Sequence, residues 1–189
     1  MKNLIAFSAV VTALFVASVV PQAHAAARPE VQTQIAENNS VSAVRALIAR
    51  CLPGVLNGKG AATAGFSKAS AATTRQMLGS RDGSVYMDYD ASLMMVDFHD
   101  VPVCRIIAMS IDPAVLADLV MRVFTEATTP FQRERFKLNT DGSFAAVYSS
   151  IGGSKGVVVR ISTDRMEDGS RFATLSVERR MSKTANVSK

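Results

Sequence analysis

The sequence predicts an α+β fold with two principal helices packed on antiparallel sheet, in the order α-βββ-α-ββββ. Two segments, one near residues 40–52 and one after Asp112, carry apolar residues at helical spacing. The remaining apolar segments are short, rich in β-branched residues, and separated by turns of Gly, Asn, Asp and Ser. Because the strands come in consecutive runs between the helices, the pattern favours antiparallel over parallel pairing.

The first 25 residues have the parts of a secretory signal peptide. Lys2 supplies a positive start, residues 4–20 are apolar and uncharged, and Ala23-His24-Ala25 offers small residues at the cleavage positions. The apolar run is about as long as a short membrane span, so an uncleaved anchor is the alternative. We expect cleavage of residues 1–25, export to the periplasm or beyond, and no integral membrane span afterwards.

Composition limits the remaining chain to one ordinary domain. We expect a flexible leader over 26–37, with its joining the first helix as the alternative, a single α+β domain over 38–180 and a disordered tail over 181–189. Trp is absent and aromatic residues make up 6% of the sequence, so the core must use aliphatic residues, Met and Phe. The net charge of +5 is modest and its charges are scattered, which is not typical of a nucleic-acid-binding protein.

The first helix is expected from Ser40, which can cap it, to Leu52. Pro53-Gly54 follows directly and is expected to end it. Residues 55–83 are rich in Ala, Thr, Ser and Gly, and within them a short helix is predicted over 67–78.

Three strands are expected next, and they are predicted to form an antiparallel meander. The middle one is almost entirely apolar, which indicates either burial on both of its faces or a Met-rich groove. Residues 99–102 form the turn that leads from it to the third strand. The three strands are predicted over 85–90, 93–98 and 103–111.

The second helix has the clearest signals. Asp112 can cap it, and Pro113 takes the first helical position, where its missing N–H has no consequence. Asp118 and Arg122 are four residues apart and can pair on the exposed side. Thr128-Thr129-Pro130 is expected to close the helix.

The last third of the chain is predicted to be strands joined by turns of Gly, Asn, Asp and Ser. Each half of the chain is thus a helix followed by a meander, which suggests a crude duplication, although no repeat is visible at the level of residues. The four strands are expected over 136–139, 144–149, 157–162 and 172–179.

Cys51 and Cys104 are the only cysteines. Cys51 falls on the apolar stripe of the first helix and Cys104 inside an apolar strand, so both can point into one core. An even cysteine count in an exported chain predicts a disulfide, because that compartment is oxidising. Two buried free thiols are the alternative.

Asp97, His99 and Asp100 are the candidate functional residues. A carboxylate two residues from an imidazole can form an acid–base pair or contribute metal ligands. A turn explains the same residues, since Asp and His are common in turns and Pro102 follows. We therefore assign no catalytic, cofactor or metal site from the sequence and expect no cofactor.

These observations favour a small, exported, non-enzymatic binding module of the cell envelope. Its expected partner is another envelope protein or an envelope component, bound through the sheet or through the groove beside the second helix. One alternative is a hydrolase or metal-dependent enzyme that uses Asp97, His99 and Asp100. Another is a secreted inhibitor or stress-protective protein. The ligand and the oligomeric state stay open.

Overall fold

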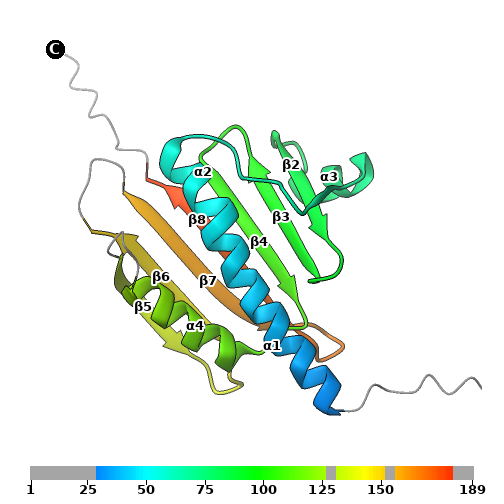
Figure 1. The fold of residues 1–189 in the computed structure, drawn as a ribbon, viewed down its shortest axis with the longest axis vertical. Helices are drawn as coiled ribbons and strands as arrows, with labels where there is room; N and C mark the ends of the chain where they lie inside the picture. The colour runs from blue at the N-terminus through cyan, green and yellow to red at the C-terminus, as the bar shows by residue number, and fades with distance from the viewer. Residues whose placement is uncertain (1–28, 127–130, 152–155, 181–189) are drawn as a thin grey trace, which may run out of the picture.

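The protein consists of one eight-stranded antiparallel sheet with helices on both of its faces, in a computed structural model that describes residues 29–126, 131–151 and 156–180 (Figure 1). The strand order is β1-β2-β3-β4-β8-β7-β6-β5, so the α+β prediction is confirmed. The predicted signal peptide and C-terminal tail lie outside the described residues. The first half contains α1 (Pro29–Ala46), the π-helix η1 (Leu47–Cys51), α2 (Leu52–Asn57), β1 (Ser67–Lys68), α3 (Ala71–Leu78), β2 (Gly83–Asp88), β3 (Leu93–Phe98) and β4 (Val103–Met109). The second half contains α4 (Pro113–Glu126), β5 (Phe131–Leu138), β6 (Phe144–Ser150), β7 (Val157–Arg165) and β8 (Arg171–Arg179).

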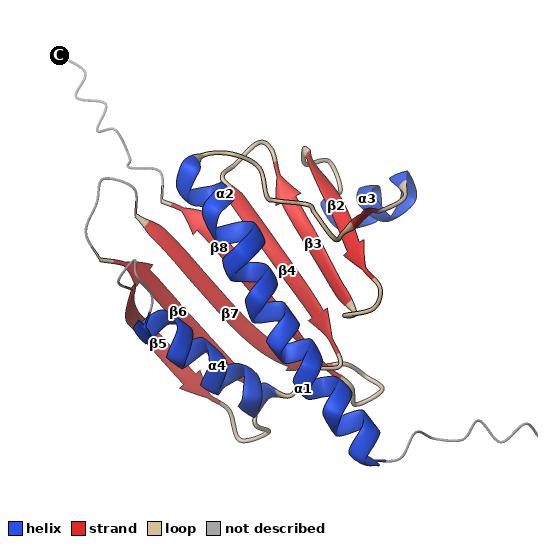
Figure 2. Ribbon diagram, in the orientation of Figure 1, coloured by secondary structure: helices blue, strands red, loops and turns tan. Residues whose placement is uncertain are grey.

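The two halves have the same layout, as the sequence suggested. In each half, a helix precedes strands that pair in chain order, and the halves join where β4 pairs with β8 in the middle of the sheet. Helices α1 and α4 lie on the same face of the sheet (Figure 2). We call this the helix-covered face, and the opposite one the open face.

The first helix begins at Pro29 and not at Ser40, so the segment expected to be an irregular leader is helical from its fourth residue onward. Ser40 does not cap the helix, because its hydroxyl lies in a buried tertiary contact. That hydroxyl accepts a hydrogen bond from the Asp112 N–H, at 3.0 Å. The contact joins the middle of α1 to the start of α4, a pairing that local sequence does not reveal.

The first helix also continues past Pro53, where the sequence predicted its end. The π-helical turn η1 places Pro53 in the first turn of α2, a position that tolerates a residue without an N–H. The helical segment ends instead at Gly58, whose left-handed conformation (φ 65°) suits glycine.

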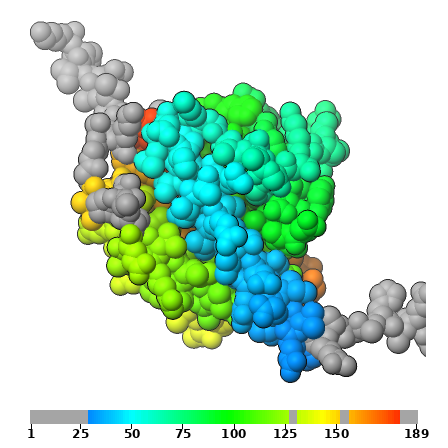
Figure 3. Space-filling model, viewed as in Figure 1, coloured from blue at the N-terminus to red at the C-terminus, as the bar shows by residue number. Residues whose placement is uncertain are grey.

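The main core lies between the helices and the helix-covered face of the sheet. In the space-filling view, side chains of α1 and α4 cover the strands that Figure 1 shows behind them (Figure 3). Alternate residues of each strand point into this core, as the period of a β-strand requires. The largest fully buried side chains of this core include Leu47, Met95, Ile106, Leu116, Phe124, Phe144, Ile161 and Leu175.

The predicted disulfide is present between Cys51 of η1 and Cys104 of β4. Both residues are buried, with exposed fractions of 0% and 1%. The bond therefore fastens the first helical segment to the central strand of the sheet. The chain between them is long, with a sequence separation of 53, so closing this loop stabilises the fold by about 4 kcal/mol in the chain-entropy model.

Helix α4 forms as the sequence predicts. The Asp112 side chain accepts hydrogen bonds from the backbone N–H groups of Ala114 and Val115, at 2.8 and 3.1 Å. Asp118 and Arg122 pair on the exposed side at 2.6 Å. The buried stripe ends in Phe124, which packs against aromatic rings of β5 and β6. The residues predicted to close the helix, 128–130, lie outside the described residues.

Strand β3 is buried on both faces, one of the two alternatives that its apolar sequence indicated. Leu93 and Met95 face the main core, whereas Val96 and Phe98 point to the other side of the sheet. There they form a second, smaller cluster with Leu78 of α3. Helix α3 thus covers the open face only over β2 and β3.

Other strand boundaries differ from the prediction. Strand β2 ends at Asp88 because residues 89–92 form a turn. Strand β5 begins at Phe131, before the predicted Phe136, and a bulge interrupts its register between Arg133 and Arg135. Residues 132–135 of β5 are all polar or charged and do not alternate with apolar residues. This fits an edge strand, in which most side chains are exposed.

Within the described ranges, none of the helices combines the length and the hydropathy needed to span a bilayer.

Candidate functional site

Asp97, near the end of β3, forms a hydrogen bond with the loop that follows α2. Its side chain points to the helix-covered face and is 9% exposed. Its Oδ2 accepts a hydrogen bond from the Ala61 N–H at 3.1 Å, and a Cβ added at Gly60 would lie 3.0 Å from the same oxygen. The carboxylate therefore anchors the loop that follows α2, and a side chain at Gly60 would press against it.

His99 and Asp100 point elsewhere and have separate partners. The His99 Nδ1 lies 3.5 Å from a carboxylate oxygen of Asp82. The Asp100 carboxylate accepts two hydrogen bonds from the Arg81 guanidinium, at 3.1 and 3.3 Å. Both pairs are solvent-exposed and join the β3–β4 turn to the residues just before β2.

Asp97 and His99 thus line the same hollow, but their polar groups bond to different partners and not to each other. The two residues line a hollow of about 300 Å³ between α2 and the β3–β4 turn, and Asp100 does not line it. Over the residues that are described, no three His, Cys, Asp or Glu side chains are grouped so that they could hold a metal ion. The contacts that these residues make stabilise the turn and the loop.

A second hollow, of about 290 Å³, lies beside α4, near the groove that the sequence suggested for binding. Phe124, Phe131 and Tyr148 line it together with the Arg133 guanidinium. The Tyr148 hydroxyl is buried and has no hydrogen-bond partner within the described part of the chain. Burial raises the pKa of Tyr148, and the nearby Arg133 charge opposes this shift. Residues 127–130, next to Phe131 in the chain, lie outside the described ranges.

The open face of β4, β8, β7, β6 and β5 has no helix over it among the elements described. Its side chains are mostly exposed or half-buried, whereas the alternate residues of β4, β6, β7 and β8 are mostly buried under the helices. One-sided burial of this kind is usual for antiparallel sheets. What distinguishes this face is the arrangement of its charges.

Three arginines stand in a single row across the open face. The strand register places Arg105 of β4 beside Ser176 of β8, and Ser176 beside Arg160 of β7. Arg160 in turn lies beside Val147 of β6, and Val147 beside Arg135 of β5. We call Arg105, Arg160 and Arg135 the arginine row. A small side chain separates each arginine from the next, so the guanidinium groups are not crowded by large neighbours.

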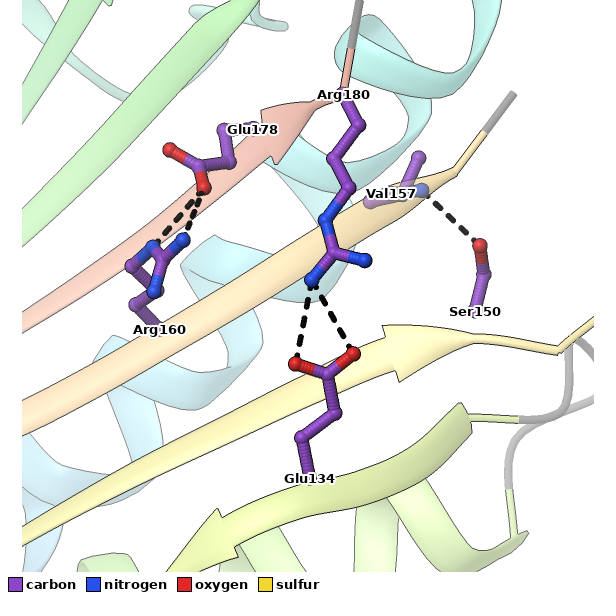
Figure 4. Close-up of polar contacts among 6 residues, drawn as sticks. All are labelled: Glu134, Ser150, Val157, Arg160, Glu178 and Arg180. Carbon is purple, nitrogen blue, oxygen red and sulfur yellow. Dashed lines mark hydrogen bonds and ion pairs between the residues drawn. The ribbon is translucent and has the colours of Figure 1, made fainter. Parts of the chain in front are cut away.

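The carboxylates nearest to this row are already paired (Figure 4). Glu178 of β8 accepts two hydrogen bonds from the Arg160 guanidinium, at 2.7 and 2.9 Å. Arg180 reaches across β7 to Glu134 of β5, with both carboxylate oxygens at 3.2 Å. The Ser149 hydroxyl, followed by the charges of Arg180 and Arg160, lowers the pKa of Glu134. Four arginines, Arg105, Arg135, Arg160 and Arg180, thus lie around the two carboxylates Glu134 and Glu178 on this face.

Arg105 and Arg135 have no carboxylate partner among the described residues. The Arg105 guanidinium lies 5.6 Å from the centre of the Phe98 ring, and its buried Nε has no hydrogen-bond partner in the described ranges. Unmade hydrogen bonds of buried donors cost free energy. Arg135, Val147, Arg160 and Glu134 surround a shallow hollow of about 320 Å³ on the same face.

Sequence reasoning missed the arginine row. The residues next to each arginine are typical of a strand and do not mark it as part of a site, and the three arginines lie far apart in the chain. Only the pairing of β4 with β8, and of β8 with β7, brings them into line. A signal for exposure did exist at Arg105 and Arg160, because each alternates with buried neighbours in its strand, whereas Arg135 lies in the mostly exposed strand β5.

Comparison of the chain with protein-family models, with curated proteins and with solved structures found no match. The fold and the surface therefore define the class of the protein by themselves. It is an α+β protein with one sheet face packed under helices and the other largely open and cationic.

Proposed function

We propose that this chain is an exported binding protein of the cell envelope that engages its partner through the open face of the sheet. The observation that carries the proposal is the arginine row, which stands on a face five strands wide whose nearby carboxylates are already paired. A surface with unpaired guanidinium groups beside small side chains suits the recognition of anionic groups.

Two features support export. The first 25 residues have the pattern of a cleaved signal peptide. The Cys51–Cys104 disulfide is of the kind that forms and persists in oxidising compartments. Export is tested by mass spectrometry of the native protein, for which we expect a mature chain that starts near Ala26 with its two cysteines linked. A native chain that keeps Met1 and has reduced thiols would contradict this part of the proposal.

A binding role fits the contacts of the other candidate residues better than catalysis does. Asp97 holds a backbone N–H, and Asp100 and His99 each pair with a residue before β2. A catalytic carboxylate must face a substrate, whereas Asp97 and Asp100 each accept a hydrogen bond from another part of the protein. Asp97 and His99 do line one hollow, which is where a hydrolase or metal-dependent activity would lie. Such an activity would be lost in the His99→Ala variant.

The binding surface is tested by site-specific photo-crosslinking in cells of the native source. A photoreactive residue at Ser176, in the middle of the open face, is expected to form one defined adduct that mass spectrometry identifies. The matched control is Ala114, an exposed residue of α4 on the helix-covered side. Adducts from Ala114 but not from Ser176 would overturn the assignment of the open face.

A further inference from the structure

We propose that the arginine row binds an acidic protein segment whose carboxylates are spaced about 10 Å apart. This inference rests on the proposed function, because it takes the open face as the binding surface. It goes further by naming the class of partner and the spacing of the groups that Arg105, Arg160 and Arg135 recognise.

The spacing follows from the geometry of the sheet. Neighbouring strands are about 4.8 Å apart, and successive arginines of the row are two strands apart. Their Cα atoms are therefore separated by about 10 Å, and the whole row spans about 19 Å. Seven residues of an α-helix rise about 10.5 Å and return to nearly the same side, so carboxylates at every seventh position match the row. In an extended segment, three residues span about 10 Å but place the side chains on opposite faces.

The surface between the arginines leaves room for such a segment. Ser176 and Val147 occupy the positions within the row. The adjacent row beyond it contains Thr174, Ser162 and Ala145, which are equally short. A partner can therefore approach the strands closely while the longer arginine side chains reach around it. The hollow over Val147 is lined by Arg135, Arg160 and Glu134, so a carboxylate that enters it meets two guanidinium groups beside a carboxylate that Arg180 already pairs.

The charges favour discrete carboxylates as ligands. Arginine presents a planar fork that pairs with a carboxylate through two parallel hydrogen bonds. Arg105 and Arg135 have no carboxylate on this fork within the described residues. Arg160 already donates through its Nε and Nη2 to one oxygen of Glu178, which leaves its Nη1 group for a second acceptor. Arg105 has no charged partner among the described residues, and a carboxylate of the bound segment would supply one.

The same face argues against a continuous anionic surface such as a lipid bilayer. Glu134 and Glu178 lie next to the arginines, and a plane of negative charge would meet these carboxylates together with the guanidinium groups. A segment with separated carboxylates can place each of them against an arginine, even where Glu134 lines the hollow between Arg135 and Arg160. We therefore assign the row to an acidic protein segment and treat binding to anionic vesicles as a test outcome.

The test uses two helical peptides of identical composition and a fluorescent label. One has glutamates at every seventh position, and the other has the same number of glutamates at every fourth position. Anisotropy titration of the purified protein at low ionic strength should show tighter binding of the first peptide. The affinity should fall as salt is added, because exposed charge pairs are screened.

Variants of the row identify the surface. The double substitution Arg135→Gln/Arg160→Gln should weaken binding of the first peptide by about tenfold, and Arg135→Lys/Arg160→Lys should weaken it less. The matched control, Arg45→Gln/Arg122→Gln, removes the same charge from helices on the other side of the sheet and should leave the affinity unchanged. Circular dichroism would confirm that each variant stays folded.

Three results would overturn the inference. One is equal binding of the two peptides, and another is an equal loss of affinity in the helix-side control. The third is arginine-dependent binding of phosphatidylglycerol vesicles without binding of either peptide. If Ser176 still forms its defined adduct in the Arg135→Gln/Arg160→Gln variant, the open face remains the binding surface and only the acidic-segment inference fails.

Discussion

The two halves of the sheet share one layout but differ in how their surfaces are used. In the N-terminal half, the open face of β2 and β3 is apolar, and Leu78 of α3 packs on Val85 and Val96. In the C-terminal half, the same face of β5 to β8 mixes charged and small polar residues with a few apolar ones and has no helix over it in the described residues. A repeated topology can thus serve stability in one half and leave a surface for recognition in the other.

The halves also differ in how the helix is attached to the sheet. The first helical segment is bonded covalently to β4 through Cys51 and Cys104. Helix α4 depends on aromatic packing, with the Phe124 ring 5.0 Å from Phe131 and 4.9 Å from Tyr148. The disulfide in the first half and the aromatic cluster in the second therefore each attach a helix to the sheet. Each can be removed separately by substitution.

Removal of the disulfide should have the largest effect. We expect Cys51→Ala/Cys104→Ala to lower the free energy of unfolding by about 4 kcal/mol, because the unfolded chain regains the freedom of a long loop. Urea denaturation measures this loss, and the wild-type protein under reducing conditions is the matched control. An unchanged midpoint in both samples would show that the crosslink does not stabilise the N-terminal half.

Truncation of the aromatic cluster should have the next largest effect. Phe124→Ala removes a side chain that is 2% exposed and leaves a cavity between α4 and the sheet, so we expect a loss of about 3 kcal/mol. Hydrogen exchange should show faster opening of β5 and β6 than of β2 and β3. Uniform acceleration over the whole sheet would mean that the two halves do not unfold separately.

The β3–β4 turn offers a smaller test that separates Asp97 from His99. Asp97→Ala leaves the Ala61 N–H without its acceptor and should cost about 1.5 kcal/mol. His99→Ala removes an exposed pair with Asp82 and should change stability by less than about 0.5 kcal/mol. Thermal unfolding compares the two variants, and zinc titration of His99→Ala against wild type checks for a metal role. Loss of zinc uptake in that variant would favour the enzyme alternative.

The smallest effect is expected at two matching turns of the C-terminal half. Asp141 and Asp168 each accept hydrogen bonds from the hydroxyl and N–H of the serine two residues later, Ser143 and Ser170. These contacts lower the pKa of both carboxyls from their ordinary value of 3.8. Their stabilising contribution is therefore complete above pH 3.8 and is lost as the pH falls through the lowered pKa.

NMR titration of the two carboxyl groups measures this effect directly. We expect both midpoints to lie below 3.8, and the Ser143→Ala and Ser170→Ala variants should each move the neighbouring midpoint back toward that value. Midpoints at or above 3.8 in the wild-type protein would contradict the hydrogen-bonded geometry of the turns.

Local patterns predicted the elements whose signals lie within a few residues. Asp112 and Pro113 marked the start of α4, and the apolar run of β3 indicated burial on both faces. Predictions based on the same kind of signal were wrong at Ser40 and Pro53. Ser40 bonds to a distant backbone group, and η1 shifts Pro53 into a tolerated position. Distant packing decided these two positions.

The sequence by itself determined the fold class and most of the helix and strand periodicities, and it limited a disulfide to one pairing. These depend on local periodicity, on turn chemistry and on a cysteine count of two. Only the tertiary structure decided which strands are neighbours and which face the helices cover. The arginine row depends on both, because residues far apart in the chain align only when β4 pairs with β8 and β8 with β7. That alignment results from side-chain packing over the whole sheet, and no short segment of the chain encodes it.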